Sequence, residues 1–202
     1  MSMTVTTTEV RKARTDDHPN VSRALTLAFF DDPVFEWIFS DVGRRRRAVP
    51  GFFDLFVAAF GPHDEIYTTD GAAGAALWLP PGAEMIAEDE LAHFGQRLQE
   101  VAGTDASRLF EVSDMMESNH PHEAHYYLNF VGVAPVHQGL GLGSALMSPV
   151  LDRCDRDGVP AYLEATTSRS RALYERHGFE VMGELACPGG GPSMWPMWRL
   201  PR

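Results

Sequence analysis

The chain has 202 residues, of which 17 are Lys or Arg and 28 are Asp or Glu, so its formal net charge at pH 7 is −11. This acidic balance argues against general binding to nucleic acid or to an anionic membrane, and it suits a cationic or amine-bearing partner. The length suffices for one domain with a sizeable core, and we expect a single domain over residues 1–202.

The cysteine content and the N-terminus indicate the compartment. Cys154 and Cys187 are the two cysteines, too few for a disulfide framework or a zinc site. The N-terminus is polar and rich in threonine, and no apolar run has the length of a signal peptide or a membrane span. We therefore expect a cytoplasmic protein with no bound metal and no membrane contact. The expected oligomeric state is a monomer or a homodimer, which the sequence does not decide.

The N-terminal quarter predicts a strand and two helices. Residues 4–13 alternate loosely between apolar and polar and predict the first strand, and Thr15 or Asp16 can cap the helix that follows. A run of four arginines at 44–47 leads into a second helix that carries many phenylalanines. Such a run usually forms a solvated face, so we expect these arginines to be exposed.

Residues 29–39 are unusually aromatic for a connection between helices. Aromatic rings with acidic neighbours can hold an amine attached to a flat or apolar body. The alternative is a helix–helix corner packed with core aromatics. If the segment binds an acceptor, its candidate residues are Phe29, Phe30, Asp32 and Trp37, and Trp78 and Tyr127 are further candidates elsewhere.

The middle of the chain predicts a hairpin, two helices and a long strand. Residues 65–69 and 72–79 flank Asp70-Gly71, which is a strong hairpin signal. Two helices are predicted over 88–101 and 105–118, and a strand over 125–133. The histidines between positions 120 and 125 are of metal-ligand type but have no obvious distant partner, so we expect solvated loop histidines.

The segment from Val131 to Leu146 contains the most informative pattern of the chain. A β-branched strand leads into a loop with glycines at positions 139, 141 and 143, and an amphipathic helix follows. Such a loop can turn several backbone N–H groups toward one point at the positive end of the helix dipole. The pattern predicts an anion site, and the anion that fits best is the pyrophosphate of a nucleotide cofactor.

The glycine spacing separates the possible motifs. A dinucleotide fingerprint needs a third glycine where this chain has Ser144 or Leu146, and a triphosphate P-loop needs a lysine that the segment lacks. The spacing Gln138-x-x-Gly141-x-Gly143 remains, beside a plain glycine-rich turn between a strand and a helix.

A second block follows this loop. Residues 161–165 predict a buried strand, and residues 172–181 predict a short helix, a glycine stop at Gly178 and another strand. The tail returns through a glycine-rich turn to a final strand over 194–200. The two blocks together are more specific than either alone.

Together these blocks resemble the GNAT superfamily of N-acetyltransferases. Gln138-x-x-Gly141-x-Gly143 is similar to the coenzyme A loop of that family, and Tyr174 with Gly178-Phe179 is similar to its Leu-Tyr-x-x-x-Gly-Phe block. The resemblance implies an α/β fold with a mixed, mostly antiparallel sheet, a parallel splayed central strand pair and flanking helices. It also implies acetyl-CoA as co-substrate, held by Val131, Gly132, Val133, Gln138, Gly139, Leu140, Gly141, Leu142, Gly143, Ser144 and Ser170.

Within the superfamily the chain is similar to the puromycin N-acetyltransferase group, from about Glu9 to Arg199. This likeness implies direct transfer in a ternary complex, without a covalent acyl-enzyme, to a primary amine of a small molecule such as an aminonucleoside or another antibiotic. One position departs from the family pattern: Ser170 stands where many relatives have an asparagine four residues before the tyrosine. A serine cannot reproduce both hydrogen bonds of an amide.

The transfer chemistry requires an acid and a base. In the related enzymes the tyrosine points at the thioester sulfur, so Tyr174 is our candidate acid, because a phenol is protonated at neutral pH. Glu164 lies among apolar and small neighbours on a predicted strand, where burial can raise its pKa, so it is our candidate base. A structural carboxylate at that position, a water relay, or a base among Asp32, Glu36, Glu123 and His125 remain alternatives.

The sequence leaves two further functions open. The same loop would serve a non-catalytic module that senses acyl-CoA, in which the phenol would be dispensable. The acceptor could also be a protein N-terminus or a lysine side chain instead of a small molecule.

Overall fold

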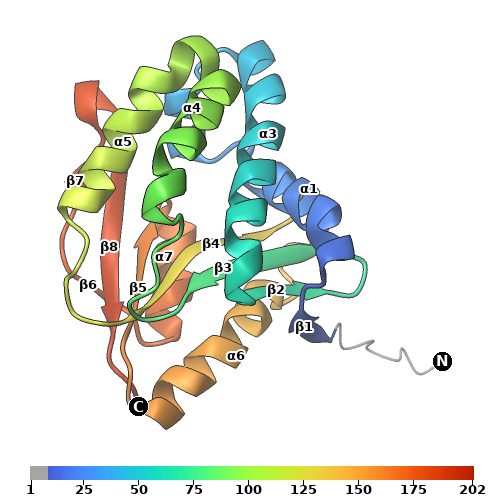
Figure 1. Cartoon of the computed structure of the whole chain (residues 1–202). Coiled ribbons are helices and arrows are strands. Elements are labelled where there is room, and N and C mark those ends of the chain that lie inside the picture. The colour runs from blue at the N-terminus through green and yellow to red at the C-terminus, as the bar shows by residue number, and fades with distance from the viewer. Residues whose placement is uncertain (1–8) are drawn as a thin grey trace.

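The computed structural model describes residues 9–202 and shows one mixed sheet flanked by helices (Figure 1). The strand order is β1-β2-β3-β4-β5-β8-β6, and β7 pairs with β8. The strands are β1 Val10–Lys12, β2 Ile66–Thr69, β3 Gly74–Leu79, β4 Tyr126–Val133, β5 Ala161–Ala165, β6 Glu180–Val181, β7 Leu185–Ala186 and β8 Ser193–Arg199.

All strand pairs are antiparallel except the central one. β4 and β5 run parallel, and their pairing consists of Tyr126 with Ala161 and Tyr127 with Tyr162. β4 continues for six residues beyond Tyr127 without further pairing to β5, so the two strands separate there. This arrangement confirms the predicted fold class, including its splayed parallel pair.

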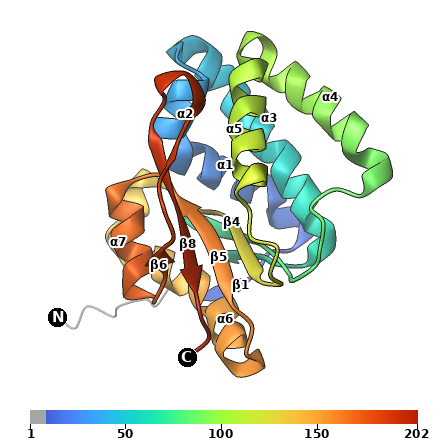
Figure 2. The same cartoon turned by 90° about the vertical axis from the view of Figure 1, so that its left-hand side faces the viewer.

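Helices cover both faces of the sheet (Figures 1 and 2). One face carries α1 His18–Phe29, α2 Pro33–Ile38, α3 Val42–Phe60, α4 Leu91–Ala102 and α5 Ala106–Ser118. The other face carries α6 Leu142–Asp157 and α7 Ser168–Arg176, which share a second core with β3, β4 and β5. In residues 9–202 no helix combines the length and the apolar character that crossing a membrane requires.

β4 contains a bulge at its centre. Trp78 pairs with Leu128 and Leu77 pairs with Phe130, which leaves Asn129 as an extra residue in β4. The extra residue reverses which side chains of β4 face the α6 core. Before the bulge the even-numbered residues face this core, and after the bulge the odd-numbered residues face it. The bulge therefore lies where β4 begins to separate from β5.

Most predicted elements are present, but the predicted exposure of the arginine run is wrong. The Asp70-Gly71 hairpin and the two helices around Gly103 are confirmed, whereas the predicted first strand is reduced to β1, and its residues 4–8 lie outside the described part. The arginine run is not a uniformly solvated face, because Arg45 is only 7% exposed. Its guanidinium donates to the carbonyl of Phe39 at 3.1 Å, since the end of α2 turns that carbonyl toward α3.

Candidate active site

The loop between β4 and α6 forms an anion cradle. Gly139 and Gly141 both have φ of +79°, a conformation that strains residues with a side chain. The first intrahelical bond of α6 runs from Ala145 N–H to Gly141 O at 3.1 Å. The N–H groups of residues 142–144 precede it and lie at the positive end of the helix dipole, as an anion requires.

Side chains tie this loop to β4 and to α7. Gln138 donates to Val133 O at 3.0 Å and accepts from Arg169 at 3.0 Å. The hydroxyl of Ser144 and the imidazole of His177 share a hydrogen bond of 2.8 Å. Arg169 and His177, which the sequence did not single out, thus lie beside the cradle through Gln138 and Ser144.

The residues present fit acetyl-CoA. Beyond Tyr127 the edge of β4 that faces β5 has no strand partner, so its backbone can bind an extended chain with amide groups, along Val131, Gly132 and Val133. The glycine loop at the end of this edge can then hold the diphosphate. Leu140 is 72% exposed, so only its backbone can serve the cradle, whereas Leu142 is buried and anchors α6. Bound here, acetyl-CoA supplies an activated acetyl group.

Ser170 is occupied by a helix cap. Its hydroxyl accepts from the Thr167 N–H at 3.2 Å, while the Thr167 hydroxyl accepts from the Ser170 N–H at 3.0 Å. These reciprocal bonds form a capping box at the start of α7. The serine therefore stabilises the helix that carries Tyr174, and its predicted contact with the cofactor would compete with this cap.

Glu164 has the environment expected of a base. The Tyr127 hydroxyl donates to Oε2 of Glu164 at 2.9 Å, and Oε1 is buried without a hydrogen-bond partner. Burial is the main cause that raises the pKa of Glu164 to about 7, and the hydrogen bond from Tyr127 lowers it in part. A carboxyl group of this pKa exchanges protons readily at neutral pH.

Tyr174 lies on α7, on the face of the sheet that α6 covers. Its side chain is 7% exposed and packs in the α6 core near Phe179. Burial raises the pKa of this phenol, and the negative charge of Asp32 raises it further. The hydroxyl is therefore protonated at neutral pH and can donate.

Asp32 connects the α1–α2 turn to the end of β5. One carboxylate oxygen caps α2 by accepting from Val34 N–H at 2.9 Å, and the other accepts from the Thr166 hydroxyl. Burial raises the pKa of Asp32. Both oxygens are occupied, so Asp32 is better placed to position the turn near Tyr174 than to take a proton.

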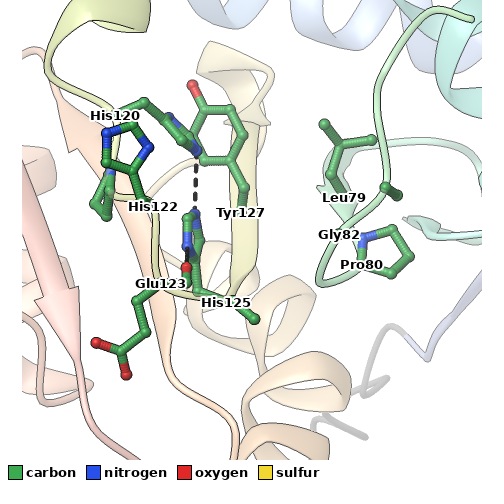
Figure 3. Close-up of a pocket in the computed structure, with 11 residues that line it drawn as sticks. Leu79, Pro80, Gly82, His120, His122, Glu123, His125 and Tyr127 are labelled. Atoms are coloured by element: carbon green, nitrogen blue, oxygen red, sulfur yellow. Dashed lines mark hydrogen bonds between the residues drawn. The ribbon is translucent and has the colours of Figure 1, made fainter.

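A cavity of about 260 Å³ lies near the start of β4 (Figure 3). Leu79 and Pro80 line one side, and His120, His125 and Tyr127 line the other. Because the Tyr127 hydroxyl binds Glu164, this residue connects the cavity to the carboxyl group. The cavity and the anion cradle lie toward opposite ends of β4.

The prediction that the histidines are solvated is wrong for two of them. His125 is 8% exposed, and its Nδ1 lies 2.6 Å from Glu123 O. Its Nε2 shares a hydrogen bond of 3.2 Å with Nε2 of His120, whose ring packs against Tyr127 at 4.7 Å between centroids. Burial lowers the pKa of both imidazoles, because the start of β4 draws this loop onto the sheet.

The predicted acceptor residues are dispersed. Phe29 packs among phenylalanines of the core, 5.5 Å from Phe130, and Phe30 lies under the Arg45 guanidinium at 4.9 Å. Trp37 contacts Arg108 at 5.1 Å, and Trp78 is fully buried in the α6 core. Of the six candidates only Tyr127 lines the cavity, and Asp32 lies near Tyr174.

Two polar residues near the Tyr127–Glu164 pair were not predicted from the sequence. Asn129, at the bulge, lies beside the Tyr127 hydroxyl, and Tyr162 is fully buried with its hydroxyl near Glu164. The one available signal was an amide in the otherwise apolar second half of the β4 sequence. Tyr162 gave no signal, because a tyrosine in a buried strand is ordinary core.

Comparisons with known proteins identify the family. Residues 73–179, more than half of the chain, match the acetyltransferase (GNAT) family. An uncharacterized N-acetyltransferase of Schizosaccharomyces pombe is 27% identical over 182 residues, which cover 84% of this chain and 73% of the relative. A mycothiol acetyltransferase of Brachybacterium faecium is 45% identical over 56 residues, 26% of this chain and 17% of that protein.

Solved structures show the same fold. A Corynebacterium glutamicum protein described as histone acetyltransferase HPA2 and related acetyltransferase has a TM-score of 0.69 at 26% identity, covering 96% of this chain and 97% of that one. The polyamine N-acetyltransferase of Drosophila melanogaster has a TM-score of 0.65 at 15% identity, with coverage of 95% and 99%. The chain belongs to the GNAT acetyltransferase family and is an acetyl-CoA-dependent N-acetyltransferase.

Proposed function

We propose that the protein transfers the acetyl group of acetyl-CoA to a primary amine of a small molecule, by direct attack in a ternary complex. The observation that carries this proposal is the position of Glu164. Its carboxyl lies at the splay, between a donor cradle at one end of β4 and a cavity near the other. Two substrates that approach from opposite ends can therefore meet beside it.

In this proposal Glu164 is the base and Tyr174 the acid. Glu164 removes a proton from the ammonium form of the acceptor, and the freed nitrogen attacks the thioester carbonyl. Unpaired N–H groups of β4 stabilise the tetrahedral oxyanion. As the C–S bond breaks, Tyr174 protonates the leaving sulfur and regains a proton from the new C–N centre, so the acceptor loses two protons overall.

The cavity size favours a compact acceptor. Sites for drug-sized ligands usually have volumes of about 300–1,000 Å³. The cavity of about 260 Å³ lies below that range, so within this proposal a small amine fits better than a whole aminonucleoside. A puromycin-like acceptor stays the second candidate, because of the sequence likeness to puromycin N-acetyltransferases.

An acceptor panel tests the proposal. Thiol release from acetyl-CoA is measured with agmatine, an arylalkylamine, puromycin and a lysine peptide, and each product is identified by mass. We expect acetylation of at least one free small amine with a kcat/KM at least about tenfold above that for the peptide. Efficient acetylation of the peptide alone would identify a protein acetyltransferase instead.

A non-catalytic sensor gives a different result in the same panel. It would bind acetyl-CoA tightly in calorimetry, but no amine of the panel would cause it to release thiol. This outcome would contradict the proposal. The cytoplasmic location and the monomeric or homodimeric state stay predictions from the sequence.

A further inference from the structure

Unpartnered buried polar atoms gather at the splay. Seven buried side-chain polar atoms of residues 9–202 lack a hydrogen-bond partner, and three of them are Asn129 Oδ1, the Tyr162 hydroxyl and Glu164 Oε1. Native proteins rarely leave buried polar atoms unpaired, and a cluster of them indicates a ligand or water that completes their hydrogen bonds. The other four lie apart, on α1, α3, β3 and β8.

The three atoms form one group around Tyr127. The Tyr127 hydroxyl donates to Glu164 Oε2 at 2.9 Å, Asn129 lies beside that hydroxyl, and Tyr162 lies beside the Glu164 carboxyl. The register explains this proximity, because Tyr127 pairs with Tyr162 in the last residue pair before the strands separate. The bulge then places Asn129 just past this point.

We propose that Asn129, Tyr162 and the free oxygen of Glu164 bind the amino group of the acceptor and make the enzyme specific for primary amines. This inference rests on the proposed function and adds the residues that select its substrate. An ammonium group has three N–H donors, and the site has three unpartnered oxygens that can accept them. Tyr127 is a positioning residue, because its donation to Oε2 leaves Oε1 for the acceptor.

The group also defines the proton step. One N–H proton of the ammonium passes to Glu164 Oε1, and the two that remain stay bonded to Asn129 and Tyr162. The nitrogen lone pair is then free to attack the thioester carbon. A secondary amine has only one N–H left after this step, so one of the two oxygens would lose its partner.

The test compares a primary amine with its N-methyl derivative. For the wild type we expect kcat/KM to be about 10- to 100-fold higher with the primary amine, because the site is built for its N–H groups. Asn129→Leu and Tyr162→Phe should each lower kcat/KM for the primary amine about tenfold or more and change that for the N-methyl amine much less. The affinity for acetyl-CoA should stay unchanged.

Controls separate this role from a structural one. Thr26→Val removes another unpartnered buried hydroxyl, on α1, and should leave the preference for the primary amine intact. Tyr162→Phe keeps the buried ring and removes only the hydroxyl, so a thermal melt should show that the variant still folds cooperatively. In the wild type the hydrogen bond from Tyr127 lowers the pKa of Glu164. Tyr127→Phe removes this bond, so the pKa should rise and the acid limb of kcat/KM should move to higher pH.

The experiment distinguishes failure of the proposed function from failure of the inference about the three oxygens. If the wild type acetylates no small amine, the proposed function is wrong. If the wild type acetylates amines but Asn129→Leu and Tyr162→Phe retain the wild-type preference, the three oxygens hold only water and the inference is wrong.

Discussion

The raised pKa of Glu164 carries a cost to stability at neutral and higher pH. Its folded pKa of about 7 lies above the ordinary value of 4.5, so the folded state holds the proton more tightly than the unfolded state. The stabilising contribution of this proton is complete below about pH 4.5 and is lost as the pH rises through about 7. At higher pH the fold must hold a buried carboxylate.

Glu164→Gln should therefore stabilise the protein in a pH-dependent way. The amide stays neutral, so we expect the variant to gain about 3 kcal/mol in free energy of unfolding at about pH 8.5, and little at about pH 4.5. Urea unfolding at both pH values measures this difference. Glu180→Gln on the exposed edge strand is the control, and an equal gain at both pH values would contradict the raised pKa of Glu164.

Tyr174 can be tested without damaging the core. Tyr174→Phe keeps the ring packed beside Phe179 and removes only the hydroxyl. We expect kcat to fall by about 10² to 10⁴, the usual range for a lost acid, with the affinity for acetyl-CoA unchanged. A kcat within about twofold of the wild type would remove the acid role.

Single residues show what the sequence could and could not predict. Glu164 and Tyr174, the base and the acid of the proposal, were already candidates in the sequence, one because a carboxyl stood among apolar neighbours and the other through a family motif. Asn129 and Tyr162 were missed, because their importance depends on a bulge and on a side chain from another strand. The acceptor candidates among residues 29–39 mostly pack in the core. In a sequence, aromatic residues of a core and aromatic residues of a binding pocket form the same pattern.

At the scale of elements, Gly132 controls how α1 approaches β4. A Cβ at this position would lie 2.7 Å from the Cβ of Ala28 and 3.0 Å from the ring of Phe29. We expect Gly132→Ala to lower the free energy of unfolding by about 1–3 kcal/mol through overpacking. It should also weaken acetyl-CoA binding, because the same stretch of β4 is proposed to hold the cofactor.

Gly95 on α4 provides the matched control. A Cβ there meets nothing within 4 Å, and the position is helical, so Gly95→Ala should raise the stability by about 0.5–1 kcal/mol. Thermal melts of both variants measure the contrast. Equal effects would show that α1 and β4 are not closely packed at Gly132.

Elements were easier to predict than their surroundings. The hairpin, the glycine loop and the helices follow from local turn chemistry and periodicity, so their order was evident from the sequence. The burial of Arg45, His120 and His125 was not evident from the sequence. It depends on backbone carbonyl groups and aromatic rings that come close to these side chains only in the folded chain. The bulge in β4 is likewise set by its pairing with β3.

At the scale of the whole molecule, the proposal has donor and acceptor meet without a covalent intermediate, and the thiols of the chain are consistent with it. Cys154 and Cys187 are both buried, and burial raises the pKa of the Cys154 thiol to about 11 and that of Cys187 above its ordinary value. Neither is a reactive thiolate at neutral pH. Incubation with acetyl-CoA alone should therefore leave the intact protein mass unchanged, and a stable increase by one acetyl group would contradict direct transfer.

The pH dependence of kcat/KM tests the central claim most directly. With acetyl-CoA and a primary amine that the enzyme accepts, we predict an acid limb with a pKa of about 7, where Glu164 loses its proton. Glu164→Gln should lower kcat/KM by about 10² to 10⁴ and abolish this limb. A Glu164→Gln variant with the wild-type rate and the same limb would show that another group takes the proton and would contradict the account.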